Sequence, residues 1–365
     1  MNRLIIIGNG FDLASGLESN YSQFILWYLK KCLSIENRLK ESNLFKFNNI
    51  DNSQVEPIIK NASSVDAFLK LLDIYKIRIE FLYPNIGFLE QIIKEVSNKK
   101  WVDIETLYFS YLLKLKDSNI VEDLKNGLIV ELNKTLSIIS ENLEEYLEEQ
   151  IPSIEIDNSY FESVKRLIFC EDLSKLNFGN GEFNKSNTLI LNFNYTNLTS
   201  KWADEPLNTS QINIHGELNK KENQIIFGYG DNTHHKYLEI EQANNTDYLR
   251  NIKSMSYPLT SNYNTLMYFL NSGKINSESD IEHNPNFEVL IYGHSCGLSD
   301  RILLKTIFEH DNCKGIHVAY HNEKNDYFNK TIEISRHFTK KDEFLKKLKS
   351  FNELLKIPQM KKDNK

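Results

Sequence analysis

Polar residues with catalytic potential end two short apolar runs in the second half of the chain. One run is Ile212-Asn-Ile-His215-Gly216, which places a histidine before a glycine. Because an unperturbed histidine has a pKa near neutrality, His215 is a candidate general base, although a lone histidine is more often structural. The other run is Thr188-Leu-Ile-Leu-Asn-Phe-Asn194. Its final asparagine can donate and accept hydrogen bonds, so Asn194 either holds a ribose hydroxyl or a water molecule, or caps a strand-to-helix turn.

A glycine-containing turn near the N-terminus is a candidate phosphate site. The sequence there is Leu4-Ile-Ile-Ile-Gly8-Asn9-Gly10-Phe-Asp12. Glycines let the backbone turn sharply and approach a ligand, and N–H groups at a helix start attract phosphate oxygens. The next glycine, Gly16, does not complete the spacing of a dinucleotide fingerprint, so an ordinary turn is the alternative. The candidate ligand contacts are Gly8, Asn9, Gly10 and Asp12.

A second glycine turn follows the apolar run over residues 287–292. It reads Gly293-His-Ser295-Cys-Gly-Leu-Ser-Asp300 and formally matches the Gly-x-Ser-x-Gly nucleophile elbow. A serine hydrolase using Ser295 is therefore one interpretation. Its acid would be Asp300 or Asp311, and its base would be His317, His321 or His337. Little of the predicted sheet remains after Ser295 to carry such a triad, which favours a second interpretation, in which Gly293 and Ser295 contact a phosphate or a ribose.

Two further groups of polar residues have simpler explanations. Asp103 and Glu105 follow Trp101 and either project toward a site or occupy the start of a helix, where negative charge suits the helix dipole. The adjacent His234 and His235 do not share a helix face, and no spacing typical of zinc ligands occurs. We therefore expect no bound metal.

Composition limits the class of protein. The net charge of -7 argues against an extended nucleic-acid surface. Four cysteines without a CxxC pair indicate reduced thiols in a cytosol. The N-terminal apolar run is too short for a signal peptide, and no segment reaches the roughly 18 apolar residues of a membrane span. These features predict a soluble cytoplasmic protein.

The elements that must position the candidate residues form an α/β fold. Apolar runs without alternation indicate strands buried on both faces, as in parallel sheets covered by helices. We expect a Rossmann-like parallel sheet with right-handed crossovers. Its predicted strands lie near residues 3–8, 187–193, 211–215, 224–228, 287–292 and 314–320. Residues 247–270 are also expected to be helical.

The length of 365 residues suggests two domains or one domain with a large insertion. Apolar residues at helical spacing dominate residues 31–180, which predicts a helical insertion with few strands. The Rossmann-like core then comprises residues 1–30 and 181–340. Residues 341–365 form a C-terminal helix, near 340–356, and a Lys-rich tail that we expect to be mobile after Pro358.

Together the motifs resemble those of two families. They are similar, across most of the chain, to the bacteriophage abortive-infection AbiH family, on the set Gly8-Asn-Gly10-Phe-Asp12, Asn-Phe-Asn194-Tyr-Thr, Ile-His215-Gly and Gly293-His-Ser-Cys-Gly. Their order also resembles the sirtuin-like NAD-consuming fold. The sirtuin resemblance implies that the first glycine turn meets the pyrophosphate of NAD and that Asn194 contacts the nicotinamide ribose. It further implies that His215 acts on that ribose and that the turn from Gly293 to Ser295 holds the adenosine side.

The chain departs from the sirtuin pattern in ways that bear on its activity. Thr196 stands in place of an aspartate, and Asp12 stands in place of a serine. The four-cysteine zinc module of sirtuins is missing from the sequence, which argues against protein deacylation.

The resemblance implies an antiphage abortive-infection protein that binds NAD and hydrolyses it to nicotinamide and ADP-ribose. The alternative is a non-catalytic sensor of NAD or ADP-ribose that controls an oligomer or a partner effector. Expected partners are the nucleotide, a second copy of the chain and a phage protein acting as trigger. No membrane or nucleic-acid partner is expected.

Overall fold

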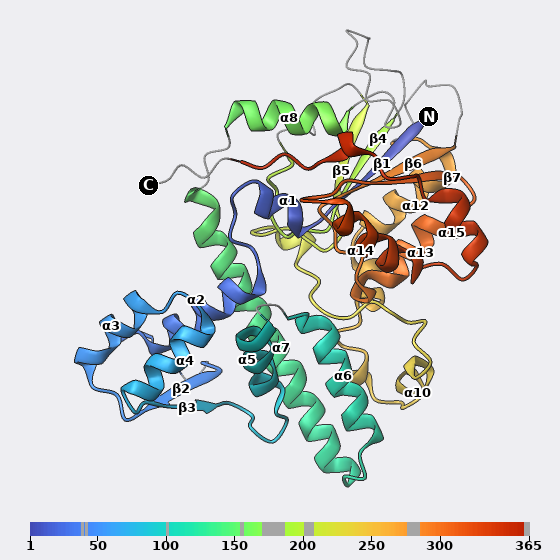
Figure 1. Cartoon of the computed structure of the whole chain (residues 1–365). Coiled ribbons are helices and arrows are strands. Elements are labelled where there is room, and N and C mark those ends of the chain that lie inside the picture. The colour runs from blue at the N-terminus through green and yellow to red at the C-terminus, as the bar shows by residue number, and fades with distance from the viewer. Residues whose placement is uncertain are drawn as a thin grey trace.

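A parallel β-sheet forms the core of the fold (Figure 1). The computed structural model describes residues 1–37, 40, 43–99, 102–153, 157–169, 187–200, 208–275 and 285–360. Within these ranges the sheet consists of β1 (Asn2–Ile7), β4 (Thr188–Asn192), β5 (Thr209–Asn213), β6 (Phe287–Tyr292) and β7 (Cys313–Val318). Every neighbouring pair of these strands is parallel. The predicted Rossmann-like parallel α/β sheet is confirmed.

The strand order creates a crevice at the carboxyl end of β1. The sheet reads β5-β4-β1-β6-β7, so the chain moves from β1 to one side and later returns to the other. Counted as sheet strands alone, this is 3-2-1-4-5, which agrees with the Rossmann order. Ile7 of β1 pairs with Asn192 of β4 and with Tyr292 of β6, so the three strands end together. In such sheets ligands bind outside the carboxyl ends of the strands, where the order reverses.

Helices cover both faces of the sheet, which explains why its strands show no alternation. Leu4 and Ile6 of β1 pack into one hydrophobic cluster, and Ile5 and Ile7 pack into another. The first cluster includes residues of α12 (Asn262–Ser272), α13 (Arg301–Glu309), α14 (Lys324–Ser335) and α15 (Lys341–Lys347). The second includes residues of α1 (Asn9–Ala14) and α8 (Asn158–Ile168). Each buried large apolar side chain contributes roughly 1.5–3 kcal/mol, so the sheet is a firm platform for the site.

The insertion has a hydrophobic cluster separate from those on the sheet. Its helices are α2 (Tyr21–Leu33), α3 (Asn52–Asn61), α4 (Val65–Ile74), α5 (Phe88–Lys99), α6 (Ile104–Asp117) and α7 (Glu122–Gln150). Two short strands, β2 (Phe45–Asn48) and β3 (Arg78–Phe81), form a two-stranded antiparallel sheet that the sequence pattern did not indicate, and α3 and α4 lie between them in the chain. Asn20 caps α2 by accepting a hydrogen bond from the Gln23 N–H at 2.9 Å, as its residue type favours. In Figure 1 these elements extend away from the sheet.

Two helices pack against a different part of the protein from the one to which the sequence division assigned them. Helix α2 begins inside the predicted core range, yet Phe24 lies in the cluster of the insertion. Helix α8 lies inside the predicted insertion range, yet Val164 packs against the sheet. Residues 218–252, which include α10 (Tyr237–Glu241), also contribute side chains to the cluster of the insertion. The sheet and the insertion therefore each include a helix that the sequence division assigned to the other.

The strand predicted over residues 224–228 is wrong. Its apolar side chains are buried in two different hydrophobic clusters, and this explains the apolar pattern without a strand. Ile226 packs against the cluster on the sheet, and Phe227 packs into the cluster of the insertion. The Ile226 N–H does donate to the carbonyl oxygen of His215 at 2.9 Å, so the segment runs beside the end of β5. It therefore lies next to the sheet without joining it.

Two predicted helices are shorter than expected. The helix over 340–356 stops at Lys347, and the following chain runs extended beside β7, where Leu348 pairs with Ile316. The helix over 247–270 is divided, because residues 249–252 are not helical and Pro258, whose ring lacks an N–H, lies in the 3-10 turn Tyr257–Leu259. It forms α11 (Lys253–Ser256) before the proline and α12 after it. The predicted mobile tail lies mostly beyond Met360, outside the described residues.

No helix within the described ranges has both the length and the apolar character needed to cross a membrane.

Candidate functional site

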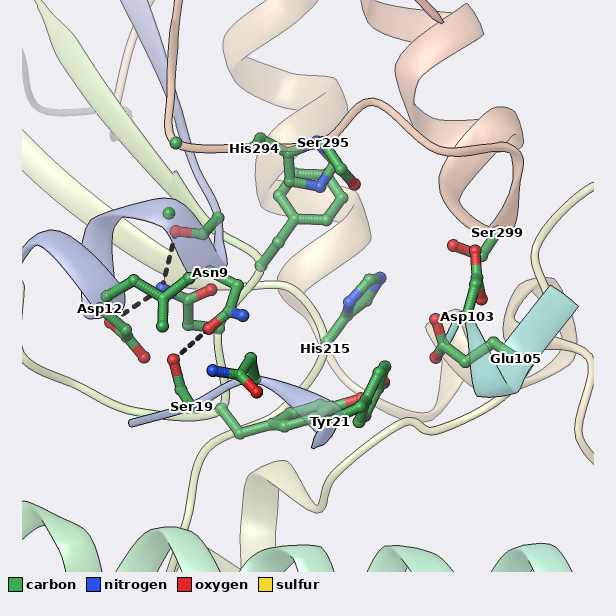
Figure 2. A pocket seen from close by; sticks show the side chains of 18 of the residues that line it. Asn9, Asp12, Ser19, Tyr21, Asp103, Glu105, His215, His294, Ser295 and Ser299 are labelled. Carbon is green, nitrogen blue, oxygen red and sulfur yellow. Dashed lines mark hydrogen bonds between the residues drawn. The ribbon is translucent and has the colours of Figure 1, made fainter. Parts of the chain in front are cut away.

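A cavity of about 410 Å³ lies at the carboxyl ends of β1, β4 and β6, between the sheet and the insertion (Figure 2). Its volume falls in the range of small-molecule sites. The eight residues singled out in the sequence all line it, namely Gly8, Asn9, Gly10, Asp12, Asn194, His215, Gly293 and Ser295. The sheet therefore brings together motifs that lie almost 300 positions apart in the chain.

The glycines of the first turn serve the contact between two turns. A Cβ on Gly10 would lie 2.7 Å from the carbonyl oxygen of Gly293, and a Cβ on Gly8 would lie 2.6 Å from Cα of His294. The Gly10 N–H donates to the Gly293 carbonyl at 2.8 Å, and the Gly8 N–H donates to the Tyr292 carbonyl at 3.2 Å. These two N–H groups are therefore engaged by the backbone and do not point at a ligand.

Asp12 organises the end of β4. Its carboxylate accepts a hydrogen bond from Asn194 Nδ2 at 2.9 Å and another from Thr196 Oγ1 at 2.6 Å. The two positions that depart from the sirtuin pattern, Asp12 and Thr196, are therefore bonded to each other. Burial raises the pKa of Asp12 to about 7, although both hydrogen bonds favour its charged form. Asn194 Nδ2 also donates to the Gly8 carbonyl at 3.2 Å, so both amide hydrogens are used and the amide oxygen remains for a ligand.

His215 is a buried, neutral histidine at the inner wall of the cavity. Its Nε2 lies 3.2 Å from the Tyr257 hydroxyl and 3.4 Å from Oδ1 of Asp300. Burial, together with the nearby Lys253 ammonium, lowers the pKa of His215 to about 3. Figure 2 shows the ring between the side of the cavity with Asn9 and Asp12 and the side with Glu105. The neutral ring can accept a proton or a hydrogen bond, and Asp300 would balance the charge of a protonated ring.

A buried ammonium joins the insertion to the core. Lys253 Nζ lies 3.0 Å from Glu105 of α6 and 2.7 Å from Asp300, and only 1% of the lysine side chain is exposed. Burial opposes the charge on Lys253, but the two carboxylates outweigh it and raise the lysine pKa. Burial likewise raises the pKa of Asp300, but Lys253 and His215 reverse this and hold it well below its usual range.

Glu105 and Asp103 come from the start of α6, and both line the cavity. Asp103 caps the helix, since its Oδ1 accepts from the Thr106 N–H at 2.9 Å. Burial raises the pKa of Glu105 to about 7 against the effect of Lys253, and the neighbouring carboxylates add to this. Asp103 and Glu105 therefore occupy the start of a helix and also project toward the cavity, so both interpretations of this stretch apply. Trp101 lies outside the described residues.

His294 is a second imidazole on Asp300. Its Nε2 lies 3.4 Å from Oδ2 of Asp300, and its Nδ1 accepts a hydrogen bond from the Cys296 N–H at 3.0 Å. Asp300 thus contacts two histidines and one lysine. Its place at the centre of this cluster is the main electrostatic feature of the inner cavity.

The serine hydrolase arrangement is not formed among the described residues. Ser295 is exposed at the cavity, and no hydrogen bond joins it to a histidine in the described part of the chain. Of the proposed bases, His337 hydrogen-bonds to the Cys296 carbonyl at 2.9 Å, and His317 lies 3.5 Å from Glu288 on the sheet. The non-glycine residue with positive φ in this turn is Cys296 and not the serine that a nucleophile elbow would strain.

Sequence reasoning missed several residues of the lining or its support, among them Lys253, Tyr257, His294 and Lys330. Lys253 and Tyr257 lie in a segment with helical periodicity and no motif, so nothing in the sequence marked them. His294 lies inside a motif that was recognised, and its spacing from Asp300 was the available signal. Among the described residues no group of histidine, cysteine and acidic side chains is arranged to hold a metal ion.

Comparison with protein-family models gives one match over residues 4–322, to the family described as "Bacteriophage abortive infection AbiH". The matched range includes the sheet except for the first two residues of β1, the insertion and all eight residues singled out from the sequence. Neither a curated protein nor a solved structure matches the chain.

Proposed function

The chain belongs to the bacteriophage abortive infection AbiH family, and on that premise we propose that its cavity binds NAD and hydrolyses it. The reaction breaks the bond between the ribose C1′ and the nicotinamide nitrogen, whose electron pair leaves with nicotinamide. The oxygen of a water molecule bonds to C1′, and one proton is released. Consumption of NAD in an infected cell would stop the host before phage matures.

The observation that carries this proposal is the position of His215 beside Asp300 in a cavity at the strand-order reversal. Cleavage of an N-ribosyl bond builds positive charge on the ribose, as it does in glycoside hydrolysis. Preorganised negative charge that faces this centre lowers the barrier. The inner cavity supplies the carboxylates of Asp103, Glu105 and Asp300 against the single ammonium of Lys253.

His215 and Asn194 have distinct roles in the proposed reaction. The neutral imidazole of His215 accepts a hydrogen bond from a ribose hydroxyl or from the attacking water, and Asp300 stabilises the positive charge that develops on the ring. The side-chain oxygen of Asn194 accepts from the same ribose or water, because Asp12 and Gly8 fix its amide group. Fixed orientation of this kind contributes through positioning. The resemblance to sirtuins at these two residues supports the same assignment.

The test is incubation of the purified protein with NAD, followed by chromatography for nicotinamide. We expect equal amounts of nicotinamide and ADP-ribose from the wild type, and none above background from His215→Ala. Binding of NAD without release of nicotinamide would replace hydrolysis by the sensor function. Failure to bind NAD at all would reject both.

A further inference from the structure

The two ends of the cavity differ in burial and in the chemical groups that line them. The inner end holds His215, Lys253 and Asp300, all buried. Asn9 and Ser295 line the same cavity and are exposed, so they mark its mouth. A ligand with one end suited to buried carboxylates and another suited to hydrogen-bond donors would have a single orientation here.

The ammonium of Lys253 is not free to bind an anion. It is engaged by Glu105 at 3.0 Å and by Asp300 at 2.7 Å, and it is almost completely buried. A phosphate placed beside it would face two carboxylates at close range, which is unfavourable. The inner end of the cavity therefore selects against phosphate.

Lys330 of α14 is the other lysine of the lining. It is half-buried, and it forms no ion pair with any carboxylate in the described part of the chain. Glu333, one turn along the same helix, is paired instead with Arg336 at 2.8 Å. Lys330 thus brings an uncompensated positive charge to the cavity.

Neutral donors accompany this charge. The side-chain oxygen of Asn9 accepts a hydrogen bond from the Ser19 hydroxyl, which leaves the Asn9 amide NH₂ as a donor. Figure 2 shows that nitrogen turned toward the cavity. The exposed hydroxyl of Ser295 is a further donor in the lining. One ammonium with amide and hydroxyl donors is a suitable set for phosphate oxygens.

We propose that Lys330, with Asn9 and Ser295, forms a phosphate subsite that directs the ribosyl bond of a nucleotide toward His215. The assignment rests on the proposed function and narrows its substrate class to phosphorylated ribosides, because a nucleoside would leave this subsite empty. The phosphate-binding groups are then side chains and not the N–H groups of Gly8 and Gly10, which donate to the neighbouring backbone.

Titration calorimetry with ADP-ribose tests the subsite, because this probe has the phosphates and lacks the bond that is cleaved. We expect Lys330→Gln to weaken binding about tenfold, as loss of one charge-assisted contact does. The wild type should also lose more affinity than Lys330→Gln when salt is added. The matched control is Lys324→Gln, on an exposed lysine of the same helix that does not line the cavity, which should bind within about twofold of the wild type.

The outcomes separate this inference from the function on which it rests. Equal affinity of Lys330→Gln and the wild type, in a protein that releases nicotinamide from NAD, would overturn the subsite and leave the hydrolase standing. Equal weakening by Lys330→Gln and Lys324→Gln would also overturn it, since the effect would then reflect overall charge. A wild type that binds neither NAD nor ADP-ribose would reject the proposed function and the subsite together.

Discussion

Replacement of Lys253 by methionine tests the buried charge cluster directly. Methionine keeps an unbranched side chain and removes the ammonium that contacts Asp300 at 2.7 Å and Glu105 at 3.0 Å. At an effective dielectric constant of about 20, each contact amounts to roughly 6 kcal/mol before the desolvation of the charges is subtracted. Desolvation offsets much of this. Because the variant leaves two buried carboxylates without their partner, we expect it to lose about 3–5 kcal/mol of unfolding free energy at pH 8.

The loss caused by Lys253→Met should shrink as the pH falls. Burial already raises the pKa of Glu105 to about 7 beside the ammonium. Without the ammonium, Glu105 and Asp300 both favour their protonated forms more strongly. The pKa of Glu105 then lies above 7, and below that pKa the folded variant binds more protons than the folded wild type, so lowering the pH stabilises the variant more than the wild type. The difference from the wild type should therefore be smaller at pH 5.5 than at pH 8.

Urea unfolding at the two pH values measures both effects. Glu105→Gln is the matched control, because it preserves the contact between Lys253 and Asp300 and should cost less than about 2 kcal/mol. Wild-type stability of Lys253→Met at pH 8 would refute the reasoning, as would a difference that grows toward acid pH.

Three further outcomes follow from the site. His215→Ala and Asn194→Ala should each lower nicotinamide release by about 10²–10⁴-fold, whereas His234→Ala, outside the cavity lining, should leave it unchanged in the same chromatographic assay. Gly10→Val should lower the thermal unfolding midpoint followed by circular dichroism, because its Cβ would lie 2.7 Å from a backbone oxygen of the facing turn. Asp12→Asn removes a buried carboxyl whose pKa is raised from 3.8 to about 7. As the pH rises from roughly 4 to 7, the unfolding free energy of the wild type should therefore fall relative to that of the variant, by at most about 4 kcal/mol. Urea unfolding measures this difference.

Local patterns in the sequence determined the sheet and most of the residues at its edge. Four-residue apolar runs such as Leu4–Ile7 are buried on both faces, so their composition alone indicates a covered parallel strand. Polar residues that end such strands must meet at one edge of the sheet, which is why Asn194, His215 and Ser295 line the same cavity. The helix cap at Asp103 was likewise predictable, since capping depends on residues only three positions apart.

Tertiary structure alone decided how these residues work. The side chain that unites the inner cavity is Lys253, which lies 148 positions from Glu105 and 47 from Asp300 and carries no local signal. Gly10 was expected to make room for a ligand, but the backbone of the turn at Gly293 fills that space. This close approach depends on how the two turns pack against each other. Charge balance and close approach depend on groups that the fold brings together from distant positions, and periodicity along one segment carries no information about them.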